Sequence, residues 1–354
     1  MHLCICKRNI EMNSKCLKTV FYFMLVSVLM LVSCKKDDDD TRESMSGSVN
    51  FDFPAYAVAG QYVESYASGV TTPADPEYVW VSHDLNISET DTVRSRSIAF
   101  YLPDEPGEYT MTVYAMHPDY YSLAKSATVV VISSDINDVG GMYPGEEEFV
   151  DPRDGESYYV RSYGSLKWFT QNLRYAGTQS DTLGCLYENS EGIDMVFGRL
   201  YSWNDATGGI SGSGLGGGPQ GACPEGWSVP TNEDWEDLAA AVGGQEYDFM
   251  DKWSGLGVVM SSAITLAGLE MWPYSPDNSH TNTSRWNGFP SGNSRDSYVD
   301  FENISTYGMW WSSSEIDDET APYRYIYYDS DTFDVYYTDK NTYGVSVRCV
   351  QVIE

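Results

Sequence analysis

The stretch Cys223-Pro-Glu-Gly-Trp-Ser-Val-Pro-Thr-Asn-Glu-Asp-Trp-Glu-Asp-Leu238, which continues to Gly244, decides how the second half of the chain folds. Thr231 and Asp234 have the spacing of a capping box, in which each side chain accepts a hydrogen bond from an otherwise unpaired backbone N–H. Apolar residues then recur at helical spacing and form one face: Trp235, Leu238, Ala239 and Val242. Gly243-Gly244 ends the pattern, because glycine adopts the left-handed C-cap conformation without a Cβ clash. We predict a short amphipathic helix here.

Four further segments occur around this stretch in a fixed order. They are Trp-Phe-Thr-Gln-Asn-Leu-Arg-Tyr at 168–175, Gly-Arg-Leu-Tyr-Ser-Trp at 198–203, Trp-Trp-Ser-Ser-Ser at 310–314 and Val-Arg-Cys-Val at 347–350. Together with the pattern Cys-Pro-x-Gly-Trp-x-x-Pro, they resemble the Fibrobacter succinogenes major paralogous domain of secreted and surface proteins. The resemblance covers roughly residues 145–352. It implies a C-type lectin-like α+β fold and supplies no reaction.

The same resemblance implies a disulfide between Cys223 and Cys349. The residues alone leave the connectivity open, because Cys185, Cys223 and Cys349 allow three pairings. With Cys223 and Cys349 paired, Cys185 is either a free buried thiol or an intermolecular link.

The composition describes an acidic chain that is long enough for two or three domains. Its 354 residues include 52 acidic and 21 basic side chains, which gives a net charge of −31. Such a surface repels phosphate backbones, so we expect no nucleic-acid partner.

Residues 1–33 have the features of a lipoprotein signal peptide. Lys7, Arg8, Lys15 and Lys18 precede the apolar run 20–32, which is too short to span a membrane comfortably. Leu31-Val-Ser-Cys34 resembles a lipobox, which implies cleavage before Cys34, acylation of its thiol and attachment to a membrane. An uncleaved anchor is the alternative, and Met12 is a possible start in place of Met1.

An acidic run, 37–40, follows the lipobox cysteine. In lipoproteins of this type such a run resembles the signal for export to the outer leaflet. We therefore expect an outer-membrane protein that faces the cell exterior, and a flexible acidic tether over residues 34–46.

Residues 47–133 show the short alternating segments of an all-β Ig-like or PKD-like sandwich. Trp80 is expected in the core between the sheets, and Tyr109 is placed like a tyrosine corner. The expected strands cover residues 49–53, 78–81, 97–101, 106–115 and 127–132. A linker at 134–148 leads to the head domain at 149–354.

Within the head, polar turns and glycines separate short elements. We expect a hairpin around 151–155, a strand at 168–175, a helix at 198–206 with Leu200 and Trp203 facing inward, and a mobile glycine-rich loop at 208–221. The closing segments 323–328, 333–337 and 343–353 are expected to form an antiparallel meander.

Candidate chemistry is sparse, and we assign no catalytic residue, cofactor or metal ligand. The dinucleotide pattern at 212–217 lacks the strand and helix that it requires. Trp203-Asn-Asp205 spells a calcium tripeptide of sugar-binding lectins, but at a different place in the fold and without its partner motif. The acidic runs 317–319 and 329–334 offer oxygens to a hard cation, although acidic turns are common without metal.

Three tyrosines give the one candidate ligand-binding surface. Tyr323, Tyr325 and Tyr327 share one face of a strand, whereas Ile326, the sole aliphatic residue, lies on the other. We expect Ile326 to face the core and the tyrosines to point outward, where rings stack on sugars or anchor proteins. Ordinary cross-strand packing of the tyrosines is the alternative.

The sequence thus predicts a surface-anchored multidomain lipoprotein that is not an enzyme: an N-terminal all-β Ig-like sandwich carries a C-terminal α+β C-type lectin-like head. The expected role is binding or adhesion to a glycan or protein. A polysaccharide-acting hydrolase or accessory protein, or a structural cell-surface protein, is the alternative.

Overall fold

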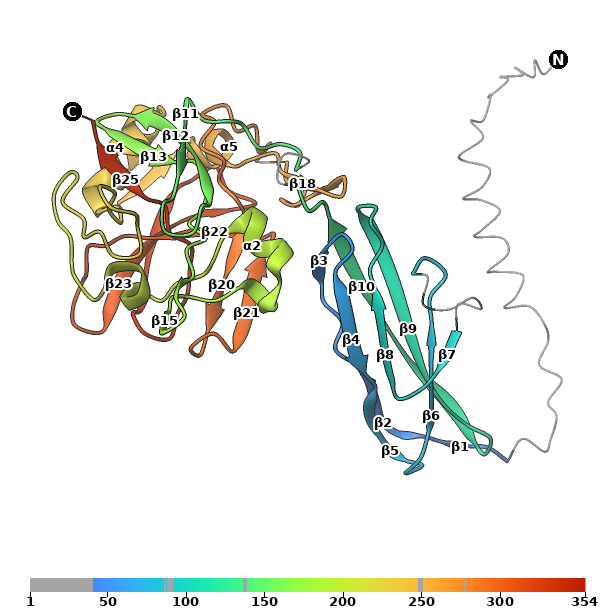
Figure 1. Ribbon diagram of the computed structural model, residues 1–354. Coiled ribbons are helices and arrows are strands. Elements are labelled where there is room, and N and C mark those ends of the chain that lie inside the picture. The colour runs from blue at the N-terminus through green and yellow to red at the C-terminus, as the bar shows by residue number, and fades with distance from the viewer. Residues whose placement is uncertain are drawn as a thin grey trace, which may run out of the picture.

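The computed structural model describes residues 41–85, 87, 92–135, 139–247, 251–276 and 278–353 (Figure 1). The predicted signal peptide, Cys34 and the acidic run lie outside these residues. An elongated N-terminal part and a broader C-terminal part follow one another along the chain, and both are rich in β-strands. In the described residues, no helix is long and apolar enough to cross a membrane.

The N-terminal part consists of two β layers around one core. Its main sheet has the order β1-β10-β9-β6-β7, with β3 pairing with β10, and the pairs β2–β5 and β4–β8 lie apart from it. The strands are β1 (Glu43–Ser44), β2 (Ser46–Asn50), β3 (Tyr56–Val58), β4 (Tyr62–Tyr66), β5 (Ser68–Thr72), β6 (Glu77–Val81), β7 (Thr92–Arg94), β8 (Ser97–Tyr101), β9 (Gly107–His117) and β10 (Tyr120–Ile132). Strands β4 and β8 alternate exposed and buried residues, so one face of each contributes to the core.

Trp80 is fully buried in this core, as predicted, and its indole N–H donates to the carbonyl of Ser95 at 2.8 Å. The Tyr109 hydroxyl donates to the carbonyl of Glu105 at 2.8 Å, which is the upstream backbone contact of a tyrosine corner. The predicted tether is too long at its C-terminal end. Glu43 and Ser44 pair with β10, and Met45 is buried, because this segment has a sheet edge to join.

The C-terminal part begins with a sheet of order β11-β12-β13-β25. Its strands are β11 (Glu147–Val150), β12 (Ser157–Tyr163), β13 (Leu166–Phe169) and β25 (Val350–Val352). The predicted hairpin is confirmed, since β11 and β12 pair antiparallel and Asp151 N–H donates to the carbonyl of Glu156 at 2.8 Å. The predicted linker is partly structured, because Gly140 bridges Thr265 and β11 begins at Glu147.

The predicted helix at 231–244 is confirmed as α4 (Asn232–Ala241). Thr231 Oγ1 accepts from Asp234 N–H at 3.2 Å, and Asp234 Oδ2 accepts from Thr231 N–H at 2.8 Å, so both halves of the capping box form. Trp235, Leu238 and Ala239 are fully buried.

The predicted helix at 198–206 is wrong in its extent. The structure has α2 (Glu191–Phe197) and α3 (Trp203–Thr207) instead. Gly198 ends α2 in a non-helical conformation at φ 75°, and Ser202 caps α3 by accepting from Asp205 N–H, so the backbone is not helical between them. Leu200 and Trp203 are buried, as expected.

The glycine-rich segment 208–221 is held in place, which contradicts the predicted mobile loop. Gly216 N–H donates to Asp234 Oδ1 at 2.6 Å, and Thr231 Oγ1 donates to the carbonyl of Gly214 at 3.1 Å. Gly212 N–H donates to the carbonyl of Ser313 at 3.0 Å. The capping residues of α4 therefore also fasten this loop.

The remaining elements of this part are small. They are the 3₁₀ helix η2 (Tyr187–Asn189), α5 (Leu256–Met260), β14 (Gly177–Thr178), β15 (Asp181–Thr182), β16 (Gln245–Tyr247), β17 (Lys252–Ser254), β18 (Thr265–Leu266), β19 (Leu269–Glu270), β20 (Ser291–Arg295), β21 (Asp300–Ile304), β22 (Tyr307–Trp311), β23 (Thr320–Tyr327) and β24 (Asp334–Asp339). Strands β22, β23 and β24 form a meander. The third predicted member of that meander belongs elsewhere, because β25 pairs with β13.

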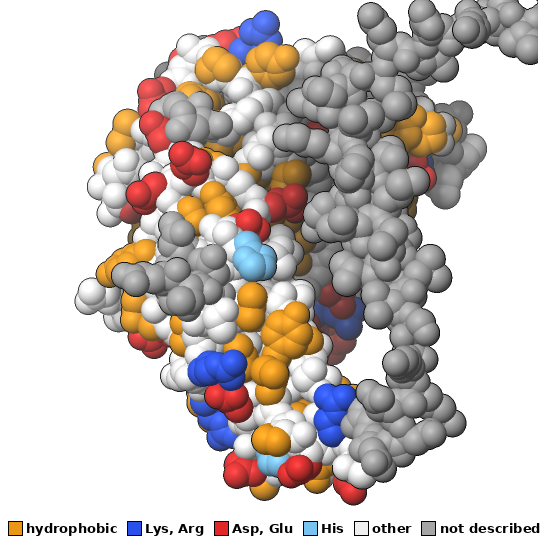
Figure 2. All heavy atoms as spheres, turned by 90° about the vertical axis from the view of Figure 1, so that its right-hand side faces the viewer, with side chains coloured by type: hydrophobic (Ala, Val, Ile, Leu, Met, Phe, Trp, Pro, Cys, Tyr) orange, Lys and Arg blue, Asp and Glu red, His pale blue; other side chains and the backbone are white. Residues whose placement is uncertain are grey.

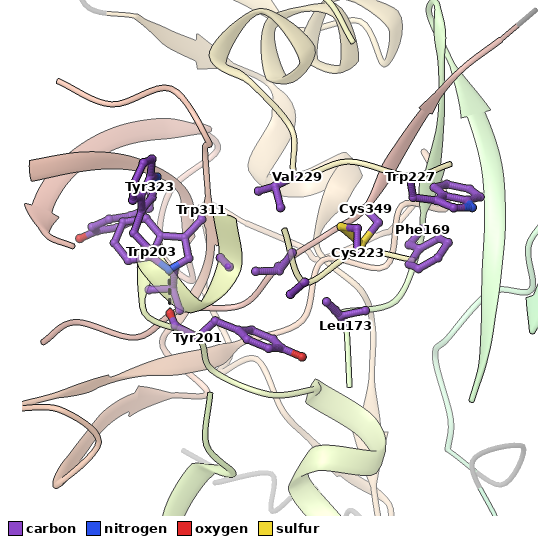
Figure 3. Close-up of a cluster of buried hydrophobic side chains, with 14 of the residues drawn as sticks. Phe169, Leu173, Tyr201, Trp203, Cys223, Trp227, Val229, Trp311, Tyr323 and Cys349 are labelled. Atoms are coloured by element: carbon purple, nitrogen blue, oxygen red, sulfur yellow. Dashed lines mark hydrogen bonds between the residues drawn. A yellow bond between two sulfur atoms is a disulfide. The ribbon is translucent and has the colours of Figure 1, made fainter. Parts of the chain in front are cut away.

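The Cys223–Cys349 disulfide is present, with the two Cα atoms 5.8 Å apart, and Cys185 is free. Both bonded cysteines are fully buried, and they lie near Phe169 and Leu173 in the close-up of Figure 3. The bridge thus joins the segment that leads into α4 to the chain that enters β25.

The two parts of the chain share an apolar contact where α2 lies against β3 (Figure 1). Ser190 Oγ donates to the carbonyl of Tyr56 at 2.9 Å. Ile132 from β10 packs in one cluster with Ile193 and Val196 from α2. The N-terminal part therefore contacts the head through packed side chains as well as through the connecting chain.

Candidate functional site

The meander β22–β23–β24 gathers tyrosines on one face. Tyr307 lies opposite Tyr327, and Tyr323 lies opposite Tyr336, in the antiparallel registers. Because side chains alternate along a strand, Tyr325 points to the same side as Tyr323 and Tyr327. We call this surface the tyrosine face; its members are Tyr307, Tyr323, Tyr325, Tyr327, Tyr336 and Tyr343.

The opposite face of β23 is core, as the position of Ile326 predicts. Ile326 is fully buried and packs in one cluster with Trp310 and Trp286. Arg324 on this face is also fully buried; its guanidinium donates to Asp251 Oδ1 and to the Asp251 carbonyl, both at 2.8 Å. The orientation of the strand is therefore the one that the sequence indicates.

The prediction that all three tyrosines are exposed is wrong for Tyr323. Its side chain is only 7% exposed, and its ring meets Trp311 edge-on at 6.1 Å and stacks on Tyr343 at 5.7 Å. Figure 3 shows Tyr323 beside Trp311 in the core cluster. Alternation assigns residues to faces, but here Tyr323 is itself covered by neighbouring rings.

The other rings of the tyrosine face are at least partly exposed. Tyr325 and Tyr327 are half-buried, and Tyr336, which lies opposite Tyr323, is 61% exposed. Ring centroids lie 4.8 Å apart for Tyr307 and Tyr327, and 5.8 Å apart for Tyr307 and Tyr325. These rings form a continuous aromatic surface that buried neighbours support from below.

Two hydroxyls of this surface, those of Tyr325 and Tyr343, have raised pKa values. The Tyr325 hydroxyl donates to Asp334 Oδ2 at 3.3 Å, and the same oxygen accepts from Lys252 Nζ at 3.0 Å. Burial, together with the Asp334 charge, raises the pKa of Tyr325 to about 12. Burial likewise raises the pKa of Tyr343. The Tyr325 and Tyr343 hydroxyls can therefore donate and accept hydrogen bonds.

One carboxylate in each acidic turn accepts hydrogen bonds from within the protein. Asp317 Oδ1 accepts from the backbone N–H groups of Glu319 and Thr320, and these bonds lower the pKa of Asp317. Asp329 Oδ1 accepts from Ser275 Oγ at 2.5 Å. Among the residues that the structure describes, no group of three or more His, Cys, Asp or Glu side chains is placed to hold a metal.

The lectin-like tripeptide also has a structural explanation. Asp205 in α3 accepts from Gly184 N–H at 3.2 Å and from the Tyr298 hydroxyl. Asn204 Nδ2 donates to Asn341 Oδ1. These contacts tie α3 to neighbouring loops.

Sequence reasoning missed Tyr307 as a member of the surface. The signal was available, because Tyr307, Met309 and Trp311 alternate in the segment that contains the Trp-Trp motif. What the sequence did not give is the pairing of this segment with β23.

Comparison with known families identifies the C-terminal part. Residues 162–351 match the model described as the Fibrobacter succinogenes major domain. No curated protein matches the chain significantly. Because the matched segment covers more than half of the 354 residues and contains the disulfide, α4 and the meander, the chain belongs to the Fibrobacter succinogenes major domain family.

Proposed function

We propose that this protein is a cell-surface binding protein whose head holds a glycan on the tyrosine face without catalysis. The observation that carries the proposal is the exposed part of that face: Tyr336, opposite the buried Tyr323, is exposed, and Tyr325 and Tyr327 are half-buried on a strand whose reverse side is packed. Aromatic rings present flat apolar faces, and their hydroxyls remain available at the edges. Sugar rings have the complementary combination of apolar C–H faces and peripheral hydroxyls.

The charge of the surroundings favours an uncharged glycan. Asp329 is exposed next to the strand that carries Tyr327, and Glu302 lies near Tyr343. The net charge of −31 would repel uronic acids and sulfated sugars. Carboxylates can accept hydrogen bonds from hydroxyls, so a neutral polysaccharide suits this rim.

Binding without catalysis is preferred over hydrolysis. A glycosidase needs two carboxylic acids on either side of the bond that is cleaved. Asp334, the carboxylate that contacts the tyrosine face, is held by Lys252 and Thr332 as well as by Tyr325. All three partners donate to the same oxygen, Asp334 Oδ2, and hold the side chain in place, which suits the positioning of a ligand.

The rest of the chain supports a role in display. The lipobox at Cys34 would anchor the protein to the outer membrane, and the acidic run behind it would direct it outward. The N-terminal part would serve as an Ig-like or PKD-like spacer. The face of the molecule in Figure 2 mixes acidic, basic and hydrophobic side chains, which is typical of a surface exposed to solvent. The proposed fold of the head is C-type lectin-like.

A glycan array probed with the mature chain tests the binding proposal. Tyr336→Ala and Tyr325→Ala should each weaken binding by about 1–2 kcal/mol, roughly 5- to 30-fold, if the rings stack on the ligand. Tyr274→Ala, which removes a ring that is 84% exposed outside the tyrosine face, is the matched control. If the mature chain bound a protein and gave no signal on the glycan array, the ligand would be a protein. Unchanged binding in both tyrosine variants would overturn the proposed surface.

Two companion variants separate binding from folding and anchoring. Ile326→Asp places a charge at a fully buried position and should unfold the head. If Ile326→Asp were tolerated while Tyr325→Ala unfolded the head, the tyrosine face would be structural. Cys34→Ala should abolish lipid labelling, and protection of the wild-type protein from protease added to intact cells would contradict outward display.

A further inference from the structure

A small cavity of about 80 Å³ lies beside β18–β19, outside the tyrosine face. Ser262, Glu270, Trp272 and His280 are among the residues that line it. Trp272 is 2% exposed and His280 is 8% exposed, whereas Glu270 is exposed. The cavity therefore has an aromatic wall inside the fold and a carboxylate toward solvent.

His280 is the unusual member of this cavity. Its ring stacks on Trp272 at 5.1 Å with 11° between the planes. Within the described part of the chain, neither ring nitrogen makes a hydrogen bond that meets the usual distance and angle limits, although the neighbouring Pro273 carbonyl favours the protonated ring. Burying a polar group without a partner costs about 1–3 kcal/mol, and a ligand that pairs with the ring would recover this cost.

Hydrogen bonds to neighbouring segments hold the loop that carries His280 and therefore fix the position of the ring. Asn278 Oδ1 accepts from His280 N–H at 3.1 Å, and Asn278 Nδ2 donates to the Ser330 carbonyl at 2.9 Å. Thr281 N–H donates to the Val258 carbonyl at 2.9 Å. These contacts keep the His280 backbone at φ +43°, in the left-handed region that is unfavourable for most side chains.

The groups around the cavity are mainly hydrogen-bond acceptors. The Ser262 hydroxyl and the Trp272 indole N–H both donate to the Gly288 carbonyl, so the lone pairs of Ser262 Oγ remain available. Neutral imidazole adds one acceptor nitrogen, and Glu270 adds a carboxylate. Burial lowers the pKa of His280 to about 4, which leaves the ring uncharged and unable to repel a cation.

From this geometry we propose that the cavity binds a primary ammonium group, with His280 and Ser262 as acceptors and Glu270 as the counter-ion. An ammonium group supplies three donors and fits a small space. The net negative charge of the chain attracts a cationic ammonium group, whereas it does not attract a neutral alcohol. The source of the group is either a free small amine or a lysine side chain, and the two are distinguished below.

Titration of the mature chain with ethylammonium chloride, followed by NMR of the histidine and tryptophan rings, tests this proposal. Saturable shifts at His280 and Trp272 are expected. Nα-acetyl-lysine amide is the second probe: saturation by both indicates access for a lysine side chain, and saturation by ethylammonium alone indicates a free amine. Equal responses to ethanol or sodium acetate, or no saturation with either amine, would overturn the proposal.

Variants provide the matched controls. Glu270→Gln should weaken ethylammonium binding about 10-fold, because a charge-assisted hydrogen bond is replaced by a neutral one. Glu148→Gln changes an exposed carboxylate in β11 and should leave binding unchanged. His280→Asn should abolish binding, since asparagine tolerates the left-handed conformation but removes the ring. Unchanged binding in Glu270→Gln would refute the site even if His280→Asn failed to fold.

Discussion

Removal of the disulfide is the sharpest test of how the head is stabilised. The bridge joins positions 126 residues apart, and both cysteines are fully buried. In the chain-entropy model, a closed loop of this length contributes about 5 kcal/mol by restricting the unfolded chain. A domain of this size loses about 2–4 °C of melting temperature per kcal/mol, so Cys223→Ala/Cys349→Ala should melt roughly 10–20 °C lower.

Tryptophan fluorescence during urea unfolding measures this effect in the intact chain. Of the ten tryptophans, Trp80 alone lies in the N-terminal part, so the signal reports mainly on the head. Cys185→Ser is the matched control, because it removes a thiol that closes no loop. Burial raises the pKa of Cys185 to about 12, which keeps this thiol protonated and slow to exchange with the disulfide. A loss below about 1 kcal/mol in the double variant would refute the loop-closure argument.

Two further predictions concern buried charges. Arg348→Lys should destabilise the head by about 3 kcal/mol or more in urea unfolding. The Arg348 guanidinium donates to Asn172 Oδ1 and to three backbone carbonyls, and one ammonium group cannot reach all four acceptors. A cost below about 1 kcal/mol would contradict this role. Asp194→Asn should stabilise the protein at pH 8 by on the order of 3 kcal/mol and have little effect at pH 4. Burial raises the folded-state pKa of Asp194 to about 6, so the stability linked to its protonation is present below pH 4 and lost as the pH rises toward 6. Equal effects at both pH values would show that charge burial is not the cause.

The sequence predicted α4 well because its determinants are local. The capping box, the apolar positions and Gly243 all lie within fourteen residues of one another, from 231 to 244. No distant contact is needed to place its ends or to choose its buried face. The first hairpin was predictable for the same reason, since its turn residues lie between the strands that they connect.

Elements that depend on distant partners were predicted poorly. The short helix α3 is fixed from outside, since Trp203 Nε1 donates to the Ser312 carbonyl at 2.9 Å, and Trp311 Nε1 donates to the carbonyl of Tyr201 just before the helix. The glycine-rich loop was misread for a related reason. Gly218 approaches the Val229 carbonyl so closely that a Cβ would clash, so glycine here permits packing rather than mobility.

In the candidate site, the alternation of side chains along the strand predicted which face each residue occupies but not how exposed it is. Alternation correctly separated Ile326 from Tyr325 and Tyr327, because the register is a property of the strand. It did not reveal that Tyr323 is covered, because Trp311 and Tyr343 reach that end of the face from other segments. The exposure of a residue depends on the neighbours that tertiary structure brings, whereas the face it occupies depends on the strand alone.

The burial of Tyr323 affects how the proposed site would bind a ligand. Tyr323 and Trp311 anchor one end of the tyrosine face in the core, and Arg324 and Ile326 fill the space behind it. The exposed rings therefore lose little conformational freedom when a ligand stacks on them, which lowers the entropic cost of binding. If Tyr323→Leu keeps the head folded but loosens this support, it should weaken glycan binding although the residue itself is buried. Unchanged affinity in a folded Tyr323→Leu variant would show that the open rings need no such support.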